Sequence, residues 1–403
     1  MTSFSMRISG STEPAYKNDR EQSSRAGGKP GLCLILLVPI DCAVLTVLLV
    51  MELVGRLWRR VAPATRPEFP VPRSKCSFVL LSWNSQTMLA ESLPALLNEL
   101  REEEGDHEVI VLDNHSTDGT DEFIRRRFPE VRLISSAENV YFGAGNRLGI
   151  AAATRDILIL MNSDIIVQPG FLPPLLQALS DPTVFGVASQ VVCTGTACTE
   201  TGNTHARIGE NDIEWTQDPV TEQISEYPVF WLHRGLFAVD RRKYLWLGGL
   251  DSLYDPLYME DVDVSYRAWK VGWKCLLAAQ SRVLHHHQIS TPAAGEGFLN
   301  MLVRRNQYIF FWKNINSLSM LTRYCFGSTS RRMRRANMKG IGILREMHSF
   351  LAALKRFPIV LVRRLSFGRR VTFSDRDVFA ASGQVGHGCS SKETCSTAPD
   401  GHM

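Results

Sequence analysis

The 403-residue sequence predicts an α/β fold in which a mostly parallel sheet is flanked by helices. Short apolar runs alternate four times with helical patterns between residues 78 and 179, and this alternation gives a parallel sheet with helices on both faces. An apolar stretch of bilayer length precedes the alternation, and a basic segment follows it. The predicted architecture is a sheet-containing core with an N-terminal membrane segment and a basic C-terminal helical region.

The N-terminal 50 residues divide into a polar leader and an apolar stretch. Residues 1–31 mix Ser, Gly, Lys and Glu without an apolar period, so they are predicted to be disordered. Residues 32–50 are rich in Leu, Val and Ile, and Asp41 is their only charged residue. One central Asp costs roughly 2.5–3.5 kcal/mol, less than the apolar side chains contribute, so an uncleaved single-pass anchor is predicted. A buried hairpin broken at Pro39 is the alternative.

The side of the membrane on which the chain lies follows from its cysteines rather than from flanking charge. Basic residues stand on both sides of residues 32–50, so the positive-inside rule is nearly tied. The nine cysteines are scattered and form no CxxC pair, which is typical of reduced thiols in the cytosol. We therefore expect the folded domain on the cytoplasmic side.

Beyond the anchor, residues 61–75 contain four prolines and are predicted to be an extended linker. Strands are then predicted at residues 78–83, 109–112, 131–134 and 157–161, each followed by a helix, and a further strand at 184–192. The polar stretch that continues to residue 226 is too long for an ordinary connection and predicts a functional loop or small subdomain. Residues 298–318 look helical and aromatic.

Basic residues are concentrated near the C-terminus, although the net charge is only +4. Residues 323–370 hold thirteen Lys and Arg against one acid, Glu346, and apolar residues are interleaved among them. Residues 319–370 are thus predicted to form an amphipathic surface on anionic lipid. A nucleic-acid patch is the competing interpretation, but the apolar anchor favours a membrane and no nucleic acid is expected. Residues 371–403 are predicted to be a flexible tail.

Acidic residues stand where the predicted strands end, which is where ligands bind in such sheets. Asp113 and Asp164 each follow a strand, and Glu260, Asp261 and Asp263 form a third group. Carboxylates at one sheet edge repel each other unless a cation neutralises them, so a divalent metal with a diphosphate is predicted. Each motif alone has a simpler interpretation: the turn at Asp113 as a helix cap, and the third group as an acidic helix N-terminus.

Three consecutive histidines follow a late apolar run. In a strand, His285 and His287 would lie on the same side, where they could bind Mn²⁺ together with Asp164. A surface histidine run without a ligand role is the alternative. The dinucleotide-binding fingerprint GxGxxG is excluded, because Leu148 stands where it needs its third glycine. The P-loop motif GxxxxGK[ST] does not occur either.

The motifs together are more specific than any one of them. The segments VLLSWNS, VIVLDNHSTDGT, ENVYFGAGNRLGI, LILMNSDIIVQPGFL and YMEDVDVSYRAW, followed by HHH, resemble in order and spacing the family 2 glycosyltransferases, especially their rhamnosyltransferase-like branch. The resemblance implies a GT-A, Rossmann-like domain over residues 76–318. It also implies transfer of a sugar from a nucleotide-diphosphate sugar with inversion at the anomeric carbon.

The resemblance assigns roles to individual residues. It implies a nucleotide-sugar site formed by Ser82, Asn84, Asp113, Asn114, Ser116, Asn139, Gly143, Asn146 and Asn162. Asp164 matches the last acid of a metal-binding DxD-like motif, with Mn²⁺ or Mg²⁺ as the expected ion. The first acid of that motif is replaced by Asn162, so binding of the metal depends more on Asp164, the phosphates and a histidine. A weakly held ion, or an enzyme that works without metal, is the alternative.

Asp261 is implied as the catalytic base, with Glu260 and Asp263 as neighbouring catalytic carboxylates. Glu260 would orient or contact the acceptor, and Asp263 would either support Asp261 or cap the helix. An inverting transfer needs one carboxylate to remove the acceptor hydroxyl proton. The sequence lacks the QxxRW motif of processive synthases, so addition of a single sugar to a lipid-linked or cell-surface saccharide is expected. A non-catalytic nucleotide-sugar or glycan scaffold is the main alternative, and a nucleotidyltransferase is a third.

Overall fold

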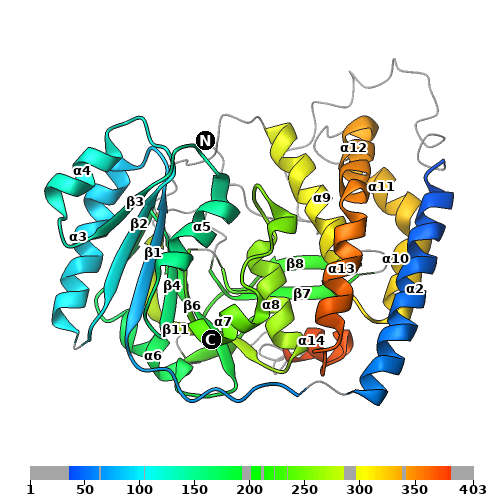
Figure 1. Ribbon diagram of the computed structural model, residues 1–403, viewed down its shortest axis with the longest axis horizontal. Coiled ribbons are helices and arrows are strands. Elements are labelled where there is room, and N and C mark those ends of the chain that lie inside the picture. The colour runs from blue at the N-terminus through cyan, green and yellow to red at the C-terminus, as the bar shows by residue number, and fades with distance from the viewer. Residues whose placement is uncertain are drawn as a thin grey trace, which may run out of the picture.

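The computed structural model describes residues 36–62, 65–103, 105–192, 201–209, 213–221, 223–233, 235–285, 296–337 and 342–382. The predicted leader, residues 32–35 and His287 lie outside them. In Figure 1 the strands stand between α3 and α4 on one side and α5 and α8 on the other, and a block of helices continues beyond α8. The sheet has nine strands, with β3-β2-β1-β4-β10-β6-β11-β5 as its main order and β9 paired to β11.

The first half of the sheet is parallel, as the sequence predicted. Its strands are β1 (Cys76–Ser82), β2 (Glu108–Asp113), β3 (Arg132–Ser135) and β4 (Ile157–Asn162). The helices between and after them are α3 (Gln86–Glu102), α4 (Thr120–Arg127), α5 (Tyr141–Ala152) and α6 (Leu172–Leu179). Side chains alternate along β1: Phe78 and Leu80 pack in one apolar core and Val79 in the other, so the sheet separates two cores.

The second half of the sheet is mixed. β10 (Leu236–Asp240) runs antiparallel between β4 and β6 (Val184–Val192), and β11 (Lys274–His285) is parallel to β6. β5 (Ile165–Val167) and β9 (Glu226–Pro228) are antiparallel to β11. The parallel pattern ends at β4, where the neighbouring strand is β10. The polar stretch connects β6 to β10 with no crossover helix in its described residues, so β10 runs antiparallel to both of its neighbours. That stretch includes β7 (Thr204–Ile208) and β8 (Ile213–Gln217), which form a separate two-stranded sheet.

Two glycines allow α5 to pack closely on the sheet. A Cβ at Gly145 would stand 2.5 Å from the Leu81 Cδ1 atom, and one at Gly149 would stand 2.6 Å from the Val79 Cγ1 atom. Neither contact leaves room for a methyl group. The segment that the sequence related to nucleotide binding is therefore held directly above the carboxyl ends of β1 and β2.

After β10 the helical elements are α7 (Arg241–Leu247), a 3₁₀ turn (Ser252–Tyr254), α8 (Glu260–Lys270), α9 (Glu296–Asn314), α10 (Leu318–Phe326), α11 (Ser328–Asn337), α12 (Gly342–Lys355) and α13 (Phe357–Gly368). Of these, α9 to α13 form the block beyond α8 (Figure 1). Several cations of the basic segment are in its interior, since Arg331, Arg332 and Arg364 are at most 4% exposed. These three arginines of the predicted membrane-surface region therefore lie inside the helical block and cannot contact lipid.

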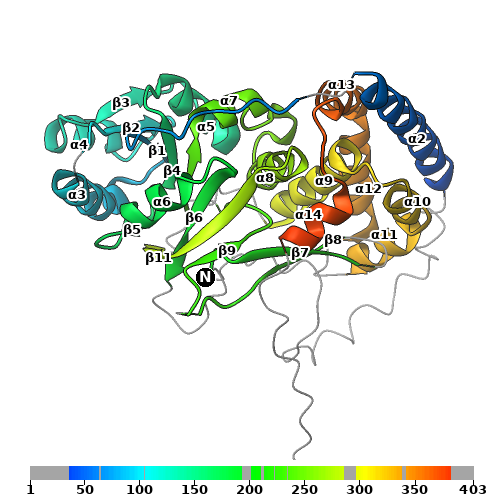
Figure 2. The ribbon, with the colours of Figure 1, turned by 90° about the horizontal axis from the view of Figure 1, so that it is seen from below.

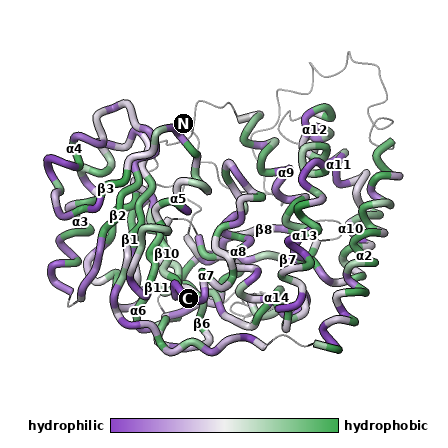
Figure 3. Tube along the Cα trace, viewed as in Figure 1, coloured by the Kyte–Doolittle hydropathy of each residue, from purple (hydrophilic) through white to green (hydrophobic). Residues whose placement is uncertain are grey.

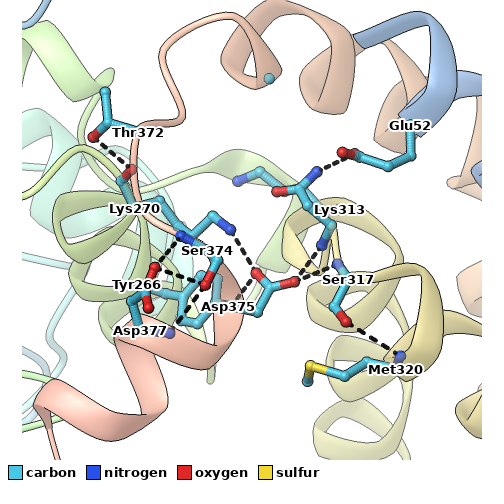
Figure 4. Close-up of polar contacts among 12 residues, drawn as sticks. Glu52, Tyr266, Lys270, Lys313, Ser317, Met320, Thr372, Ser374, Asp375 and Asp377 are labelled. Carbon is cyan, nitrogen blue, oxygen red and sulfur yellow. Dashed lines mark hydrogen bonds and ion pairs between the residues drawn. The ribbon is translucent and has the colours of Figure 1, made fainter. Parts of the chain in front are cut away.

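The predicted flexible tail is wrong for residues 371–382, which include helix α14 (Asp375–Ala381). Asp375 is 1% exposed and accepts hydrogen bonds from Lys270 Nζ, Tyr266 Oη and the backbone N–H of Ser317. Figure 4 shows Asp375 between these groups, which come from α8 and from the start of α10. One buried carboxylate thus anchors the segment, a feature that its polar composition did not reveal.

The predicted anchor forms helix α2 (Val38–Val61), which is shifted towards the linker relative to residues 32–50. Within the described residues, α2 is the one helix long and apolar enough to cross a membrane, with a mean hydropathy of 2.1 in its best window. Figures 1 and 2 both place it at the outer edge of the helical block, beside α10 and α13. The chain then continues as an extended segment from residue 65 to β1, as the prolines predicted.

Candidate active site

The carboxyl ends of β1, β2 and β4 bring the predicted donor-binding residues to one edge of the sheet. Ser82 ends β1 and is in register with Asp113, which ends β2. Asn162 ends β4 and is in register with Leu81 of β1, and Asp164 follows in the tight connection to β5. The parallel pairing therefore places side chains from three separate sequence motifs next to one another.

Ser82 and Asp113 present buried polar atoms to this edge. Within the described part of the chain, neither Ser82 Oγ nor Asp113 Oδ1 has a hydrogen-bond partner. Burial raises the pKa of Asp113, against the opposing effect of its hydrogen bonds from Ser116. Because unpaired buried polar atoms are costly, this pair is suited to a ligand that supplies hydrogen-bonding groups, such as a nucleoside.

The loops after β1 and β2 are tied together by the predicted residues. The Asn84 backbone N–H donates to Ser116 Oγ at 2.8 Å, and Asn84 Oδ1 accepts from the Thr117 backbone N–H at 2.8 Å. Asn84 has a φ of 50°, a left-handed conformation that Asn tolerates better than most residues. These Asn84 contacts join the loop after β1 to the loop after β2.

Asn114 and Asn139 connect the same edge to the start of α5. Asn114 Nδ2 donates to Asn139 Oδ1 at 2.9 Å, while Asn114 Oδ1 accepts from the Val140 backbone N–H at 2.9 Å. The side chains of Asn114 and Asn139 thus form hydrogen bonds within the protein and fix the position of the start of α5. Gly143 lies where a Cβ would stand 2.5 Å from Asp255 Oδ1, which explains the glycine there.

A pocket joins the donor side of the site to the predicted catalytic carboxylates. Asn146 and Asn162 line it from α5 and β4, and Glu260 and Asp261 line it from the start of α8. Its remaining walls are apolar and are formed by Phe142, Leu160, Met161, Phe237 and Leu250. The EDVD motif and the donor motifs, about a hundred residues apart in sequence, therefore meet in one cavity.

A strained turn delivers Asp261 to this pocket. Tyr258 and Met259 have φ values of 74° and 75°, unusual for residues with side chains, and α8 begins immediately afterwards. Asn306 on α9 holds the turn, because its Nδ2 donates to the carbonyls of Leu257 and Tyr258 at 2.9 and 2.8 Å. Asp261 itself is 6% exposed, and its Oδ1 accepts from the next backbone N–H at 2.8 Å.

Asp263 lies on the opposite side of α8, away from the pocket, and is fully buried. Its carboxylate accepts hydrogen bonds from Arg267, Lys313, Asn314 and Tyr254 at 2.7–2.8 Å. Burial raises the pKa of Asp263, but Arg267 and Lys313 outweigh it and hold the pKa well below its usual range. The sequence grouped Asp263 with the catalytic carboxylates; these contacts favour a positioning role that fixes α8.

Sequence reasoning missed the residues on α9 that support the site. Lys313 also pairs with Asp251 at 2.7 Å, so one buried cation joins a carboxylate on α8 to one at the start of the 3₁₀ turn. Asn306 and Lys313 stand among aromatic residues in the predicted helix at 298–318. Polar side chains at such positions need buried partners, and that signal could have identified them.

A second missed contact joins α5 to the loop before α8. Arg147 on α5 forms a bidentate ion pair with Asp255, at 3.0 and 2.7 Å. Both side chains are about one-third exposed. The pair connects α5, which carries Asn146, to the loop that leads into Asp261 at the start of α8.

Two of the three predicted metal ligands lie together. Asp164 Oδ2 is 3.1 Å from His285 Nε2, because β5 and β11 pair beside them. No group of three or more His, Cys, Asp or Glu side chains suited to a metal occurs in the described ranges, and His287 is outside them. A carboxylate and an imidazole fit a divalent ion whose other ligands are phosphate oxygens and water.

A half-parallel sheet with polar residues at its strand ends, opposite a carboxylate at a helix start, is the arrangement of the GT-A fold. The family model described as "Glycosyl transferase family 2" matches residues 77–244. The solved structure of GalNAc-T7 with UDP, GalNAc and Mn²⁺ shares the fold, with a TM-score of 0.51 at 16% identity over 74% of this chain and 59% of that one.

The chain belongs to glycosyltransferase family 2, in its rhamnosyltransferase-like branch. It is 30% identical to N-acetylglucosaminyl-diphospho-decaprenol L-rhamnosyltransferase of Mycobacterium tuberculosis over 277 residues, which cover 57% of this chain and 87% of the relative. It is also 25% identical to polypeptide N-acetylgalactosaminyltransferase 11 of Xenopus tropicalis, over 47% of this chain and 34% of that protein.

Proposed function

We propose that this glycosyltransferase moves one hexosyl or deoxyhexosyl unit from a nucleotide-diphosphate sugar to a hydroxyl of a lipid-linked saccharide, with inversion. The observation that carries the proposal is the shared pocket, in which Asn146 and Asn162 face the same space as Asp261. A donor bound at the strand ends would extend its sugar into this pocket. The carboxylate of Asp261 would then lie beside the reacting carbon.

In the proposed reaction, Asp261 removes the proton from the acceptor hydroxyl as its oxygen attacks C1 of the sugar. The bond from C1 to the nucleoside diphosphate breaks on the opposite face, so a single displacement inverts the configuration. Ser82 and Asp113 bind the nucleoside, and Asp263 holds α8 so that Asp261 keeps its position. General-base assistance of this kind contributes about 10²–10⁴-fold to a rate.

We also propose that Asp164 and His285 hold a divalent cation, Mn²⁺ or Mg²⁺, against the donor diphosphate. Such an ion stabilises the negative charge that develops on a departing phosphate. The support is the 3.1 Å approach of the two side chains, with Asn162 in place of a third acid. The ion would therefore depend strongly on both residues.

The acceptor class is proposed from the M. tuberculosis relative, whose name specifies a saccharide linked through diphosphate to decaprenol. A polyprenyl acceptor requires the enzyme to work at a membrane, and the apolar helix α2 fits membrane association. The described cysteines, Cys42, Cys76, Cys275 and Cys325, are free thiols, which fits a position on the cytoplasmic side. Both a single crossing by α2, as the sequence predicts, and a surface position of α2 allow this placement.

The proposal is tested by following nucleoside diphosphate release from UDP-, dTDP- and GDP-sugars by the full chain in detergent, with a prenyl-diphosphate-linked N-acetylglucosamine acceptor. One nucleotide is expected to support release, and NMR of the product is expected to show the anomeric configuration opposite to that of the donor. A product with retained configuration would contradict the single displacement. Donor binding without release, with and without acceptor, would favour the non-catalytic scaffold.

His285→Ala is expected to raise the Mn²⁺ concentration needed for half-maximal activity by about tenfold or more, because the ion loses one of two protein ligands. Titration of Mn²⁺ by electron paramagnetic resonance, with nucleoside diphosphate present, checks this without turnover. His348→Ala is the matched control, since His348 is exposed on α12. An unchanged Mn²⁺ dependence in His285→Ala would remove His285 from the metal site.

A further inference from the structure

The two acidic residues of α2 lie on one face of the helix and point into the protein. The buried residues of α2 are Asp41, Val44, Leu48 and Glu52, which are three, four and four positions apart. This spacing places them along one side of a helix. Asp41 and Glu52 are 8% and 2% exposed, although they are the acidic residues of a mostly apolar helix.

Asp41 is matched to a site on the helical block. Its two carboxylate oxygens each accept a hydrogen bond of 2.6 Å from Arg332 of α11, and Oδ2 also accepts from Ser328 Oγ at 2.7 Å. Arg332 is 0% exposed. A buried bidentate pair of this kind is geometrically specific, so the two helices are fixed to one another.

Glu52, eleven residues further along α2, is matched in the same way. Its carboxylate accepts from Asn316 Nδ2 at 2.6 Å and from Arg364 of α13 at 3.3 Å. Arg59, one of the last residues of α2, donates to Glu52 at 2.6 Å and to the Gly368 carbonyl at 2.9 Å. Both halves of α2 are therefore docked on the body of the enzyme through polar contacts.

The opposite face of α2 is exposed and apolar, and we call it the outer stripe. It consists of Leu36, which precedes the helix, and of Val38, Val47, Val50, Leu53, Val54, Leu57, Trp58 and Val61, each at least 37% exposed. Helix α13, which packs beside α2, adds Ile359, Val362 and Leu365. Figure 3 shows α2 as mostly hydrophobic along its length. An apolar surface of this extent is typical of a docking face.

Basic residues border the outer stripe. Arg60 is exposed on α2 and Arg369 just after α13, and the Arg369 guanidinium lies 3.7 Å from the centre of the Trp58 ring. Both acids of α2 are buried, and the sequence of α13 contains none. An apolar face with exposed cations and aromatic side chains complements the boundary of an anionic lipid bilayer.

A crossing by α2 is incompatible with these contacts. Helix α11 packs beside α2 and carries four arginines in ten residues, so a spanning α2 would draw α11 into the hydrocarbon region. If α2 instead crossed alone, Arg332 and Arg364 would each lose a carboxylate while remaining inside the protein. Unpaired buried charge is strongly destabilising.

We infer that α2 does not cross the membrane but lies along its surface, docked on the enzyme through Asp41 and Glu52, with the outer stripe facing anionic lipid. This arrangement replaces the single crossing that the sequence predicts. It rests on the proposed membrane association but not on the proposed chemistry. The enzyme would thereby hold its pocket at a fixed orientation to the bilayer that carries the acceptor.

Protease protection tests the topology on the full chain with an N-terminal epitope tag, in sealed vesicles whose cytoplasmic face is outward. Digestion of both the tag and the catalytic domain from the outside is expected for a surface helix. Protection of the tag while the domain is digested would establish a crossing and overturn the inference. The readout needs no activity, so loss of sugar transfer alone would affect only the proposed function.

Vesicle sedimentation tests the outer stripe. Leu57→Glu is expected to reduce binding of the full chain to phosphatidylglycerol-containing vesicles at least about tenfold, because it places a charge in the lipid-facing surface. Ile208→Glu on β7 is the matched control, because Ile208 is 40% exposed and lies in the separate two-stranded sheet, and its binding is expected to stay within about twofold. Equal binding by both variants, or self-association through the stripe without vesicle binding, would overturn the inference.

Asp41→Asn separates the two topologies by the sign of its effect. If α2 is docked, the substitution removes the carboxylate that pairs with Arg332. The melting temperature in detergent is then expected to fall by several degrees. A crossing helix would lose only an unfavourable charge, and its insertion would improve. An unchanged melting temperature together with firmer resistance to carbonate extraction would therefore contradict the docked arrangement.

Discussion

Asp261→Asn is expected to lower the rate of sugar transfer by roughly 10²–10⁴-fold, while the affinity for the donor nucleotide stays within about twofold. The amide keeps the size of the side chain and can still accept from the backbone N–H of Val262, as Asp261 Oδ1 does at 2.8 Å. It cannot remove a proton from the acceptor hydroxyl. Initial rates of nucleoside diphosphate release, with calorimetric titration of the nucleotide, measure the two quantities separately.

Asp106→Asn is the matched control for this experiment. Asp106 is an exposed carboxylate, with a side chain 56% accessible, and its surface pairs with Lys75 and Arg155 contribute little to stability. Its transfer rate is expected to stay within about twofold of the wild type. Retention of more than a tenth of the activity by Asp261→Asn would exclude Asp261 as the base and direct attention to Glu260, which lines the same pocket.

Lys313→Met is expected to produce the largest loss of stability, about 3–5 kcal/mol in the free energy of unfolding. Lys313 is 3% exposed and neutralises both Asp251 and Asp263 at 2.7–2.8 Å. Methionine has a similar length but no charge, so two buried carboxylates would lose a shared cation. The midpoint of urea unfolding, followed by circular dichroism, measures the loss.

Lys274→Met serves as the control, because Lys274 forms a half-exposed pair with Asp181 at 3.4 Å, and its loss is expected to cost no more than about 1 kcal/mol. Adding Asp251→Asn to Lys313→Met is expected to restore part of the stability, since one unpaired charge is removed. If the single variant unfolds at the wild-type midpoint, the buried network does not stabilise α8 as argued.

The same network predicts how stability depends on pH. Arg267 and Lys313 hold the folded-state pKa of Asp263 below its value in an unfolded chain, against the opposing effect of burial. The resulting stabilisation is complete above the unfolded-state pKa of about 3.9 and is lost as the pH falls towards the lower folded-state pKa. The difference in unfolding midpoint between wild type and Lys313→Met is therefore expected to narrow below about pH 4.

Much of the sheet could be predicted because apolar periodicity is a local property. The strands β1, β2, β3 and β4 agree with the predicted segments within two residues at each end. The antiparallel insertion of β10 could not be predicted, because strand order depends on contacts between segments far apart in sequence. α14 was missed for a related reason: its anchor is one aspartate, Asp375, whose partners are on α8 and at the start of α10.

The candidate site shows the same division. Motif order was enough to nominate Asp113, Asp164 and Asp261, since each stands at a strand end or a helix start that the pattern reveals. Motif order alone grouped Asp263 with Asp261, and only the family resemblance singled out Asp261 as the base. The structure gives the two carboxylates different surroundings, because residues two apart on a helix point in nearly opposite directions: Asp261 lines the pocket and Asp263 contacts Lys313.

The sequence by itself determined the family and the parallel half of the sheet, and it nominated residues for the chemistry, because these follow from local periodicity and short motifs. Only the tertiary structure decided which carboxylates meet the donor edge and which are neutralised inside the protein. It also decided that Asp41 in the apolar segment has a partner, Arg332, on another helix. The physical reason is that a charge is costly or favourable according to the groups that surround it, and those groups are brought together only by folding.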